Sequence, residues 1–184
     1  LPDPEPLYST LLSPKLSTRP RARDTQMIGS GDKAPDFTLP RTDNGTGETM
    51  LTLSALAPRR VVLYFYPKDD TPGCTTEALD FTRLGAEFEA AGAIVIGISK
   101  DTAAKHEKFC AKHGLGVVLV SDAEGATCEA YGTWVEKTMY GRSSMGIQRA
   151  TFLIDATGTV VQAWPKVSVA GHAEAVLEAV RALG

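Results

Sequence analysis

The chain has 184 residues, of which 43% are hydrophobic, with 19 Lys and Arg against 22 Asp and Glu. That length fits one domain, and a net charge of −3 excludes a polybasic nucleic-acid binder. The longest apolar runs, such as Val61–Tyr66, are far shorter than the roughly 18–20 residues that span a bilayer, and three cysteines are too few for a disulfide scaffold.

Residues 1–26 differ in composition from the rest of the chain. They hold five of the eleven prolines and four basic residues, and they show no sustained periodicity. We interpret them as a flexible leader, a translated upstream stretch or an expression remnant that precedes a domain over residues 27–184. A transit-peptide remnant is disfavoured by Asp3 and Glu5.

From Met27 onward the pattern is one of alternating strands and helices. Short strands over 31–39 and 49–53 flank the turn signal Asp43-Asn44-Gly45 and predict a hairpin. The continuous apolar run Val61–Tyr66 predicts a central strand buried on both faces. Further strands are expected over 93–98, 117–120, 148–154 and 160–164, and helices over 75–91, 102–113, 126–131 and 173–183.

This order of elements predicts the fold class. Strands that alternate with helices favour a three-layer α/β/α sandwich with an N-terminal β-hairpin. The last two strands are joined by the turn at residues 155–158, so they form an antiparallel pair and make the central sheet mixed.

The junction between the central strand and the first long helix carries the candidate chemistry, since ligands bind at such junctions in open α/β sheets. Thr71 and Pro72 are typical of an N-cap and the first helical residue. Cys74 then lies in the first turn, beside unpaired backbone N–H groups and the positive end of the helix dipole. Both favour the thiolate, which is the nucleophilic form of cysteine.

The helix phase directs Cys74 toward the core, because Ala78, Phe81 and Phe88 share its face. Burial opposes ionisation of a thiol, so a reactive thiolate there needs a cationic partner. Arg149 is the candidate.

Period-2 alternation over residues 147–154 places Arg149 on one strand face with Ile147, Thr151 and Leu153. An unpaired guanidinium on such an apolar face is costly.

Each of these residues also has an ordinary structural explanation. A lone buried cysteine is commonly a small core side chain, Pro67 can simply end a strand, and Arg149 can belong to a structural salt bridge. The charged residues around Cys74 are expected to form a solvated rim: Lys68, Asp69, Asp70 and Glu77.

The motif Pro67-x-x-x-Thr71-x-x-Cys74 resembles the active-site signature of the peroxiredoxins. The fuller run Tyr66–Glu77 is similar to the bacterioferritin comigratory protein, or peroxiredoxin Q, branch of that family. The resemblance extends from about residue 31 to the C-terminus, and it includes Gly31-Asp32-x-Ala34-Pro35-Asp36-Phe37, Tyr131-Gly132-x-Trp134 and Met145-Gly146-Ile147-x-Arg149-x-Thr151.

The resemblance implies a thioredoxin-like fold and an antioxidant peroxidase that reduces hydrogen peroxide and alkyl hydroperoxides without a metal or organic cofactor. Cys74 would be the peroxidatic nucleophile and become a sulfenic acid. Thr71 would orient the peroxide, and Arg149 would stabilise the thiolate and the charge that develops on the oxygens. Pro67 would shield the pocket from water, and the backbone N–H groups of Gly73 and Cys74 would add donors.

The resolving cysteine is where this chain departs from many members of the branch. Those members carry it five residues after the peroxidatic cysteine, at the position of Leu79 here, and others carry it about three dozen residues later. Cys110 follows Cys74 by 36 residues, so the resemblance implies an intramolecular Cys74–Cys110 disulfide.

Such a bridge requires Cα atoms within about 7 Å, and hence local unfolding near residues 74–80 and 110. A core role for Cys110, or a one-cysteine mechanism resolved by an external thiol, stays open. Cys128 is expected to be a core residue.

The resemblance further implies recycling by thioredoxin or a similar dithiol protein. An intramolecular bridge needs no second chain, which favours a monomer, and free cysteines suit the reducing cytoplasm, although an organelle stays open. No nucleic-acid or membrane partner is expected. A peroxide sensor or redox relay that uses Cys74 is the alternative function, while a thiol–disulfide oxidoreductase is disfavoured by the lack of a C-x-x-C motif.

Overall fold

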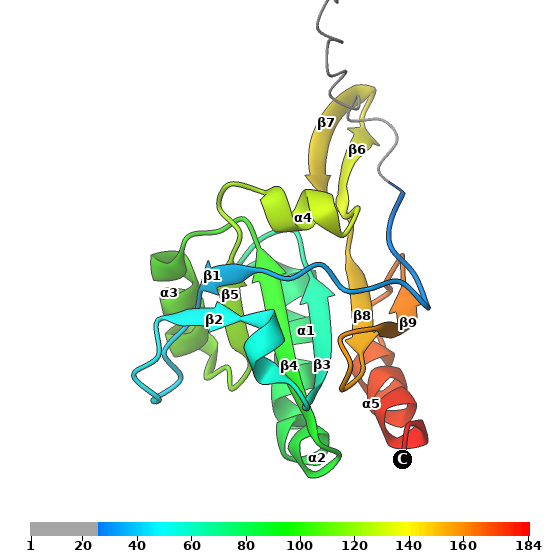
Figure 1. The fold of residues 1–184 in the computed structure, drawn as a ribbon. Helices are drawn as coiled ribbons and strands as arrows, with labels where there is room; N and C mark the ends of the chain where they lie inside the picture. The colour runs from blue at the N-terminus through cyan, green and yellow to red at the C-terminus, as the bar shows by residue number, and fades with distance from the viewer. Residues whose placement is uncertain (1–25) are drawn as a thin grey trace, which may run out of the picture.

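A computed structural model describes residues 26–184. The predicted leader, residues 1–26, lies outside the described residues apart from Gln26. The central sheet has the strand order β5-β4-β3-β8-β9 (Figure 1). Its strands are β3 (Arg60–Phe65), β4 (Ala93–Ser99), β5 (Val118–Ser121), β8 (Ala150–Ile154) and β9 (Val160–Trp164).

Strand β3 is the centre of a mixed sheet. It pairs parallel with β4, which pairs parallel with β5, and antiparallel with β8, which pairs antiparallel with β9. Five of its six residues are buried, as expected for a continuous apolar run that has layers on both faces.

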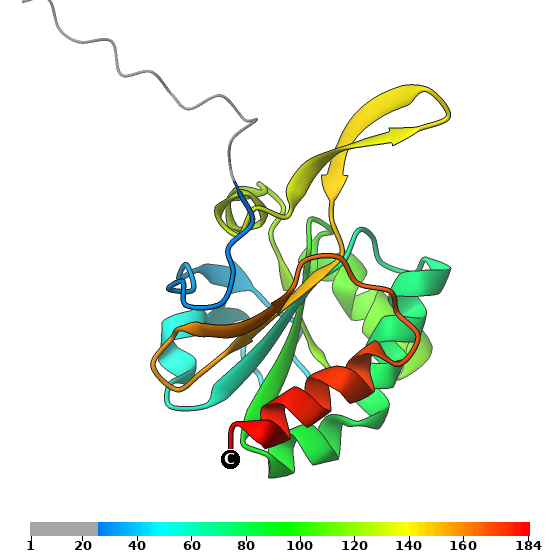
Figure 2. The same ribbon diagram turned by 90° about the vertical axis from the view of Figure 1, so that its right-hand side faces the viewer.

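Four helices cover one face of the sheet. They are α1 (Pro72–Arg83), α2 (Gly85–Ala90), α3 (Ala103–His113) and α5 (His172–Ala182). Figure 2 shows α1 and α5 lying along this face. Their apolar side chains meet alternate strand residues in one cluster, the helix-side core, which includes Val62, Tyr64, Phe81, Phe109 and Val176.

The other face is covered by short elements. These are the hairpin of β1 (Thr38–Pro40) and β2 (Met50–Thr52), the 3₁₀ helix η1 (Leu53–Leu56), and α4 (Ala126–Ala130). They enclose a second cluster, the opposite core, which includes Leu63, Phe65, Cys128, Tyr131 and Phe152. The expected layered α/β sandwich with a mixed sheet and an N-terminal hairpin is therefore confirmed.

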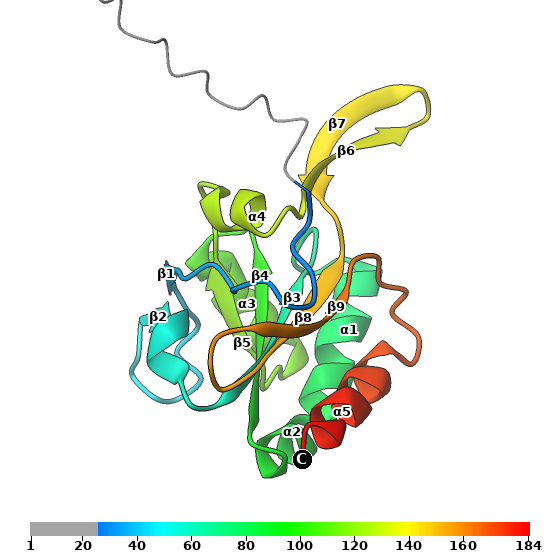
Figure 3. The ribbon, with the colours of Figure 1, turned by 45° about the vertical axis from the view of Figure 1, so that its right-hand side comes forward.

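Three features differ from the sequence prediction. Of the strand expected over residues 31–39, only the end lies in a strand, β1. The helix expected over residues 75–91 is divided at Leu84 into α1 and α2. A further hairpin, β6 (Trp134–Met139) and β7 (Arg142–Ile147), projects from the body of the protein (Figure 3). Most of its side chains are exposed or half-buried, so its strands lack the apolar alternation that marks a strand packed on a core. Among the described residues, no helix is long and apolar enough to cross a membrane.

Candidate active site

The first turn of α1 is built as the sequence predicts. Thr71 is the N-cap, in an extended conformation, and Pro72 is the first helical residue. The Thr71 hydroxyl does not cap the helix; it donates to the carbonyl oxygen of Lys68 at 2.9 Å. The backbone N–H groups of Gly73 and Cys74 belong to the first turn and have no partner within the helix. Two backbone donors therefore remain available in the first turn, which also carries Cys74.

Cys74 lies at the edge of the helix-side core and is 2% exposed. Ala78 and Phe81 are buried on the same helix face, as expected from the helix phase. Arg149 Nη2 donates to Cys74 Sγ at 3.3 Å. A Cβ on Gly73 would lie 3.3 Å from the same Nη2, so the glycine leaves room for the guanidinium to reach the sulfur.

Arg149 does not lie within the strand that the alternation of residues 147–154 had predicted. It lies between β7 and β8 rather than within a strand. Ile147 packs in the opposite core, whereas Leu153 packs in the helix-side core with Cys74. The expectation of a single face therefore holds for Arg149, Thr151 and Leu153, since Thr151 contacts His172 of α5. It is wrong for Ile147, because the two residues between the strands interrupt the period of two.

Glu77 belongs to the site, and its assignment to a solvated rim was wrong. Its side chain is 2% exposed, and Oε1 accepts from Arg149 Nη1 at 2.7 Å. Oε2 has no hydrogen-bond partner among the described residues. Burial raises the pKa of Glu77 to about 7, although Arg149 acts to lower it. The spacing in the sequence could have predicted this burial, since a residue three positions after Cys74 shares its helix face.

Asp69 was also wrongly placed in the solvated rim. It is 9% exposed, accepts from Tyr66 Oη at 2.6 Å, and lies 2.7 Å from His106 Nδ1 on α3. Lys68 and Asp70 are exposed, as predicted.

The other predicted site residues, Pro67 and Thr71, differ in how far they are exposed to solvent. Pro67 is exposed in the loop that follows β3, and Thr71 is half-buried. Lys137 of β6 brings a second cation; burial, and then the nearby Arg149, lower its pKa. The hairpin that the sequence analysis missed therefore contributes to the electrostatics of the site.

The other two cysteines lie in different layers. Cys110 on α3 is half-buried and packs against the helix-side core, as Cys74 does. Burial, reinforced by Glu107, raises the pKa of the Cys110 thiol to about 11. Cys128 is fully buried in the opposite core, which confirms its prediction as a core residue. All three thiols are free.

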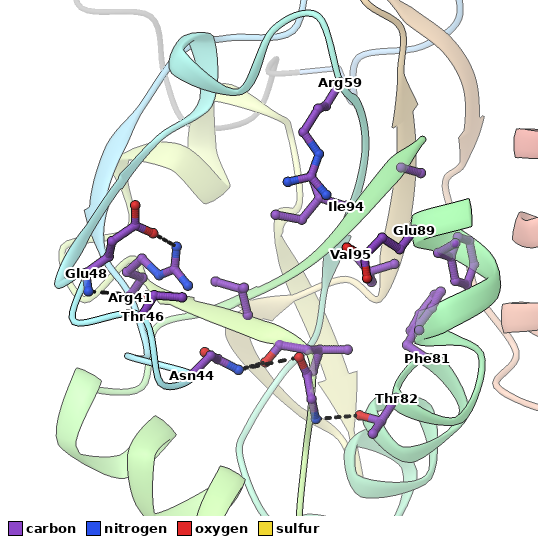
Figure 4. A pocket seen from close by; sticks show the side chains of 16 residues that line it. Arg41, Asn44, Thr46, Glu48, Arg59, Phe81, Thr82, Glu89, Ile94 and Val95 are labelled. Atoms are coloured by element: carbon purple, nitrogen blue, oxygen red, sulfur yellow. Dashed lines mark hydrogen bonds and ion pairs between the residues drawn. The ribbon is translucent and has the colours of Figure 1, made fainter. Parts of the chain in front are cut away.

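A groove of about 570 Å³ lies farther along α1, and it contains none of the candidate residues (Figure 4). Phe81 and Thr82 line it on one side, and an ion pair of Arg41 with Glu48 lies across it. Within residues 26–184, no cluster of three or more His, Cys, Asp or Glu side chains has the geometry of a metal site.

Comparison with known proteins agrees with the motifs. The AhpC/TSA family matches residues 30–163. Peroxiredoxin Bcp of Xanthomonas campestris pv. campestris is 52% identical over 149 residues, which cover 81% of this chain and 92% of that protein. Peroxiredoxin Bcp of Bacillus subtilis is 44% identical over 154 residues, which cover 84% of this chain and 96% of that protein.

Solved structures give the same answer for the fold. A structure of Xanthomonas campestris peroxiredoxin Q has a TM-score of 0.74 and 51% identity, covering 79% of this chain and 90% of that one. A cysteine variant of the Xylella fastidiosa peroxiredoxin Q has a TM-score of 0.78 and 42% identity, and the match covers 86% of this chain and 98% of that one. The expected resemblance is confirmed: the chain belongs to the AhpC/TSA family, in its peroxiredoxin Bcp and peroxiredoxin Q branch.

Proposed function

We propose that this protein is a thiol peroxidase that reduces hydrogen peroxide and alkyl hydroperoxides with Cys74 as its nucleophile. The observation that carries the proposal is the contact of 3.3 Å between Cys74 Sγ and Arg149 Nη2 at the first turn of α1. It is supported by a solved relative, the Xanthomonas campestris bacterioferritin comigratory protein, which is 50% identical and was studied for its alkyl peroxide reduction activity.

In the first step, the Cys74 thiolate attacks the terminal oxygen of the hydroperoxide. An S–O bond forms and the O–O bond breaks, which gives the sulfenic acid and an alkoxide or hydroxide that takes a proton from solvent. Arg149 and the N–H groups of Gly73 and Cys74 stabilise the charge that develops on the oxygens. The Thr71 hydroxyl gives its own hydrogen to Lys68 O, so its oxygen is available to accept from the peroxide O–H.

In the second step, the Cys110 sulfur attacks the sulfur of the Cys74 sulfenic acid. The S–S bond forms, the S–O bond breaks, and water leaves with the proton of Cys110. The spacing supports this assignment: Xanthomonas campestris peroxiredoxin Q was solved as two cysteine-to-serine variants at positions 36 residues apart, and Cys74 and Cys110 have the same separation.

A dithiol protein completes the cycle by thiol–disulfide exchange, in which its own two thiols become the disulfide. Thioredoxin is the reductant that we propose. The bridge lies within one chain, so the protein can act as a monomer. Its three free thiols suit the reducing cytoplasm, where a disulfide is a transient catalytic state.

Consumption of NADPH with thioredoxin, thioredoxin reductase and peroxide tests this function. The wild type should turn over repeatedly, whereas a sensor would react once. Cys74→Ser should abolish turnover. Cys110→Ser should form the sulfenic acid and then stop, and Cys128→Ser is the matched control that should keep turning over. Turnover by Cys74→Ser would refute the proposal, and full turnover by Cys110→Ser would instead support a one-cysteine mechanism.

A further inference from the structure

The loop before α1 is joined to α3 by a buried pair of side chains. Asp69 lies in this loop, five residues before Cys74. Its Oδ2 lies 2.7 Å from Nδ1 of His106, which is completely buried on α3. Its Oδ1 accepts from Tyr66 Oη at 2.6 Å. The pair therefore links the segment that carries Cys74 to the helix that carries Cys110.

Both ring nitrogens of His106 take part in hydrogen bonds. Nε2 lies 3.1 Å from the carbonyl oxygen of Val120, and a carbonyl can only accept, so Nε2 carries a hydrogen. The contact of Nδ1 with Asp69 also requires one hydrogen, whether on the ring or on the carboxyl group. Asp69 and His106 thus share one hydrogen across their contact, Nε2 holds a second, and both ring nitrogens are hydrogen-bonded.

A second, exposed set of contacts surrounds the buried pair. Asp70 has a positive φ of 57°, and its carboxylate accepts from Lys112 Nζ at 2.6 Å and from His113 Nε2 at 2.8 Å. Exposed ion pairs contribute little to stability, so the buried pair is the stronger link. His106 lies one helical turn before Cys110, and Lys112 and His113 follow it, so the contacts flank Cys110 on both sides.

We propose that the Asp69–His106 pair is a latch that holds the Cys74 loop on α3 and sets the rate of disulfide formation. This inference rests on the proposed function. For Cys110 to attack the Cys74 sulfenic acid, the two Cα atoms must come within about 7 Å. Because the Cys74 sulfur is buried and held by Arg149 at 3.3 Å, we expect the first turn of α1 to leave its place in the helix-side core. The loop held at Asp69 resists that movement, which makes His106 a positioning residue for the resolving step.

Replacing His106 by leucine tests the latch. It removes both hydrogen bonds of the ring and leaves Asp69 Oδ2 without its partner, while Tyr66 Oη still donates to Oδ1. Opening becomes easier, and we expect disulfide formation about tenfold faster, which corresponds to about 1.4 kcal/mol. His106→Asn can keep a donor toward Asp69, so its rate of disulfide formation should lie between that of His106→Leu and that of the wild type.

The assay follows Cys74 after one equivalent of hydrogen peroxide, with alkylation and mass spectrometry at successive times. The rate of sulfenic acid formation should not change in His106→Leu, since the ring hydrogen-bonds Asp69 and the Val120 carbonyl rather than the residues proposed for the first step. Under excess peroxide, faster bridging should leave less Cys74 sulfinic acid. A general loss of stability would not speed disulfide formation while leaving the rate of sulfenic acid formation unchanged.

Tyr131→Phe is the matched control. It removes a buried hydrogen bond, Tyr131 Oη to the carbonyl oxygen of Pro35, in the opposite core, and should bridge at the wild-type rate. If His106→Leu does not fold, Asp69→Ala tests the same pair, with the same acceleration expected. An unchanged or slower bridge in the latch variants, or equal acceleration in Tyr131→Phe, would overturn the latch. A wild type that forms no bridge would instead refute the proposed resolving step.

Discussion

Replacing Glu77 by glutamine removes a carboxyl group whose ionisation opposes folding. Burial raises the pKa of Glu77 from 4.5 to about 7, and its Oε2 has no partner among the described residues. Between these pH values the native state keeps a proton that the unfolded state has released, so the wild type loses stability as pH rises. Each pKa unit corresponds to 1.36 kcal/mol, so the loss is about 3 kcal/mol.

Urea denaturation of the wild type and Glu77→Gln from about pH 4.5 to about pH 8 measures this loss. The difference in the free energy of unfolding should shift in favour of the glutamine variant by about 3 kcal/mol across the range. Glu87→Gln is the control, since Glu87 is half-exposed in a surface pair with Arg181, and it should keep the pH dependence of the wild type. A difference between Glu77→Gln and the wild type that stays constant with pH would show that burial does not raise the pKa of Glu77.

Arg149→Met should slow the reaction of Cys74 with peroxide by about 10² to 10³, because it removes the side-chain donor at the sulfur; an unchanged rate in stopped-flow kinetics would contradict its role. Tyr64→Phe should stabilise the protein toward denaturant by about 1 kcal/mol, because the buried hydroxyl has no partner among the described residues; a loss of stability would show that the hydroxyl is paired. Gly97→Ala should destabilise by about 1–3 kcal/mol, since its Cβ would lie 2.6 Å from Tyr64 Cζ; a neutral result would mean that the ring moves aside easily.

The parts of the fold that the sequence predicts are those with a strong local signal. The apolar run at residues 61–66 marks β3, because a strand buried on both faces carries no alternation. Thr71 and Pro72 mark the start of α1 and so place Cys74 in its first turn. The hairpin of β6 and β7 has no such signal, because it packs little of its surface and turns at Tyr140, a residue unusual at positive φ.

The polar partners of the site were harder to predict than its nucleophile. Charged residues in a loop or first turn are usually solvated, and only tertiary packing shows that Glu77 and Asp69 are buried. Glu77 is held by Arg149, which is 72 positions away, and Asp69 by His106, which is 37 positions away. Neither pairing has a local sequence signature, whereas the position of Cys74 follows from its immediate neighbours.

In the proposed cycle, Cys74 reacts with peroxide and then bridges to Cys110. Peptide mapping by mass spectrometry, after one equivalent of hydrogen peroxide and without added thiol, tests it directly. We expect a Cys74–Cys110 disulfide, with Cys128 still a free thiol. A Cys74–Cys128 bridge, or an unmodified Cys74 after the peroxide has been consumed, would contradict it.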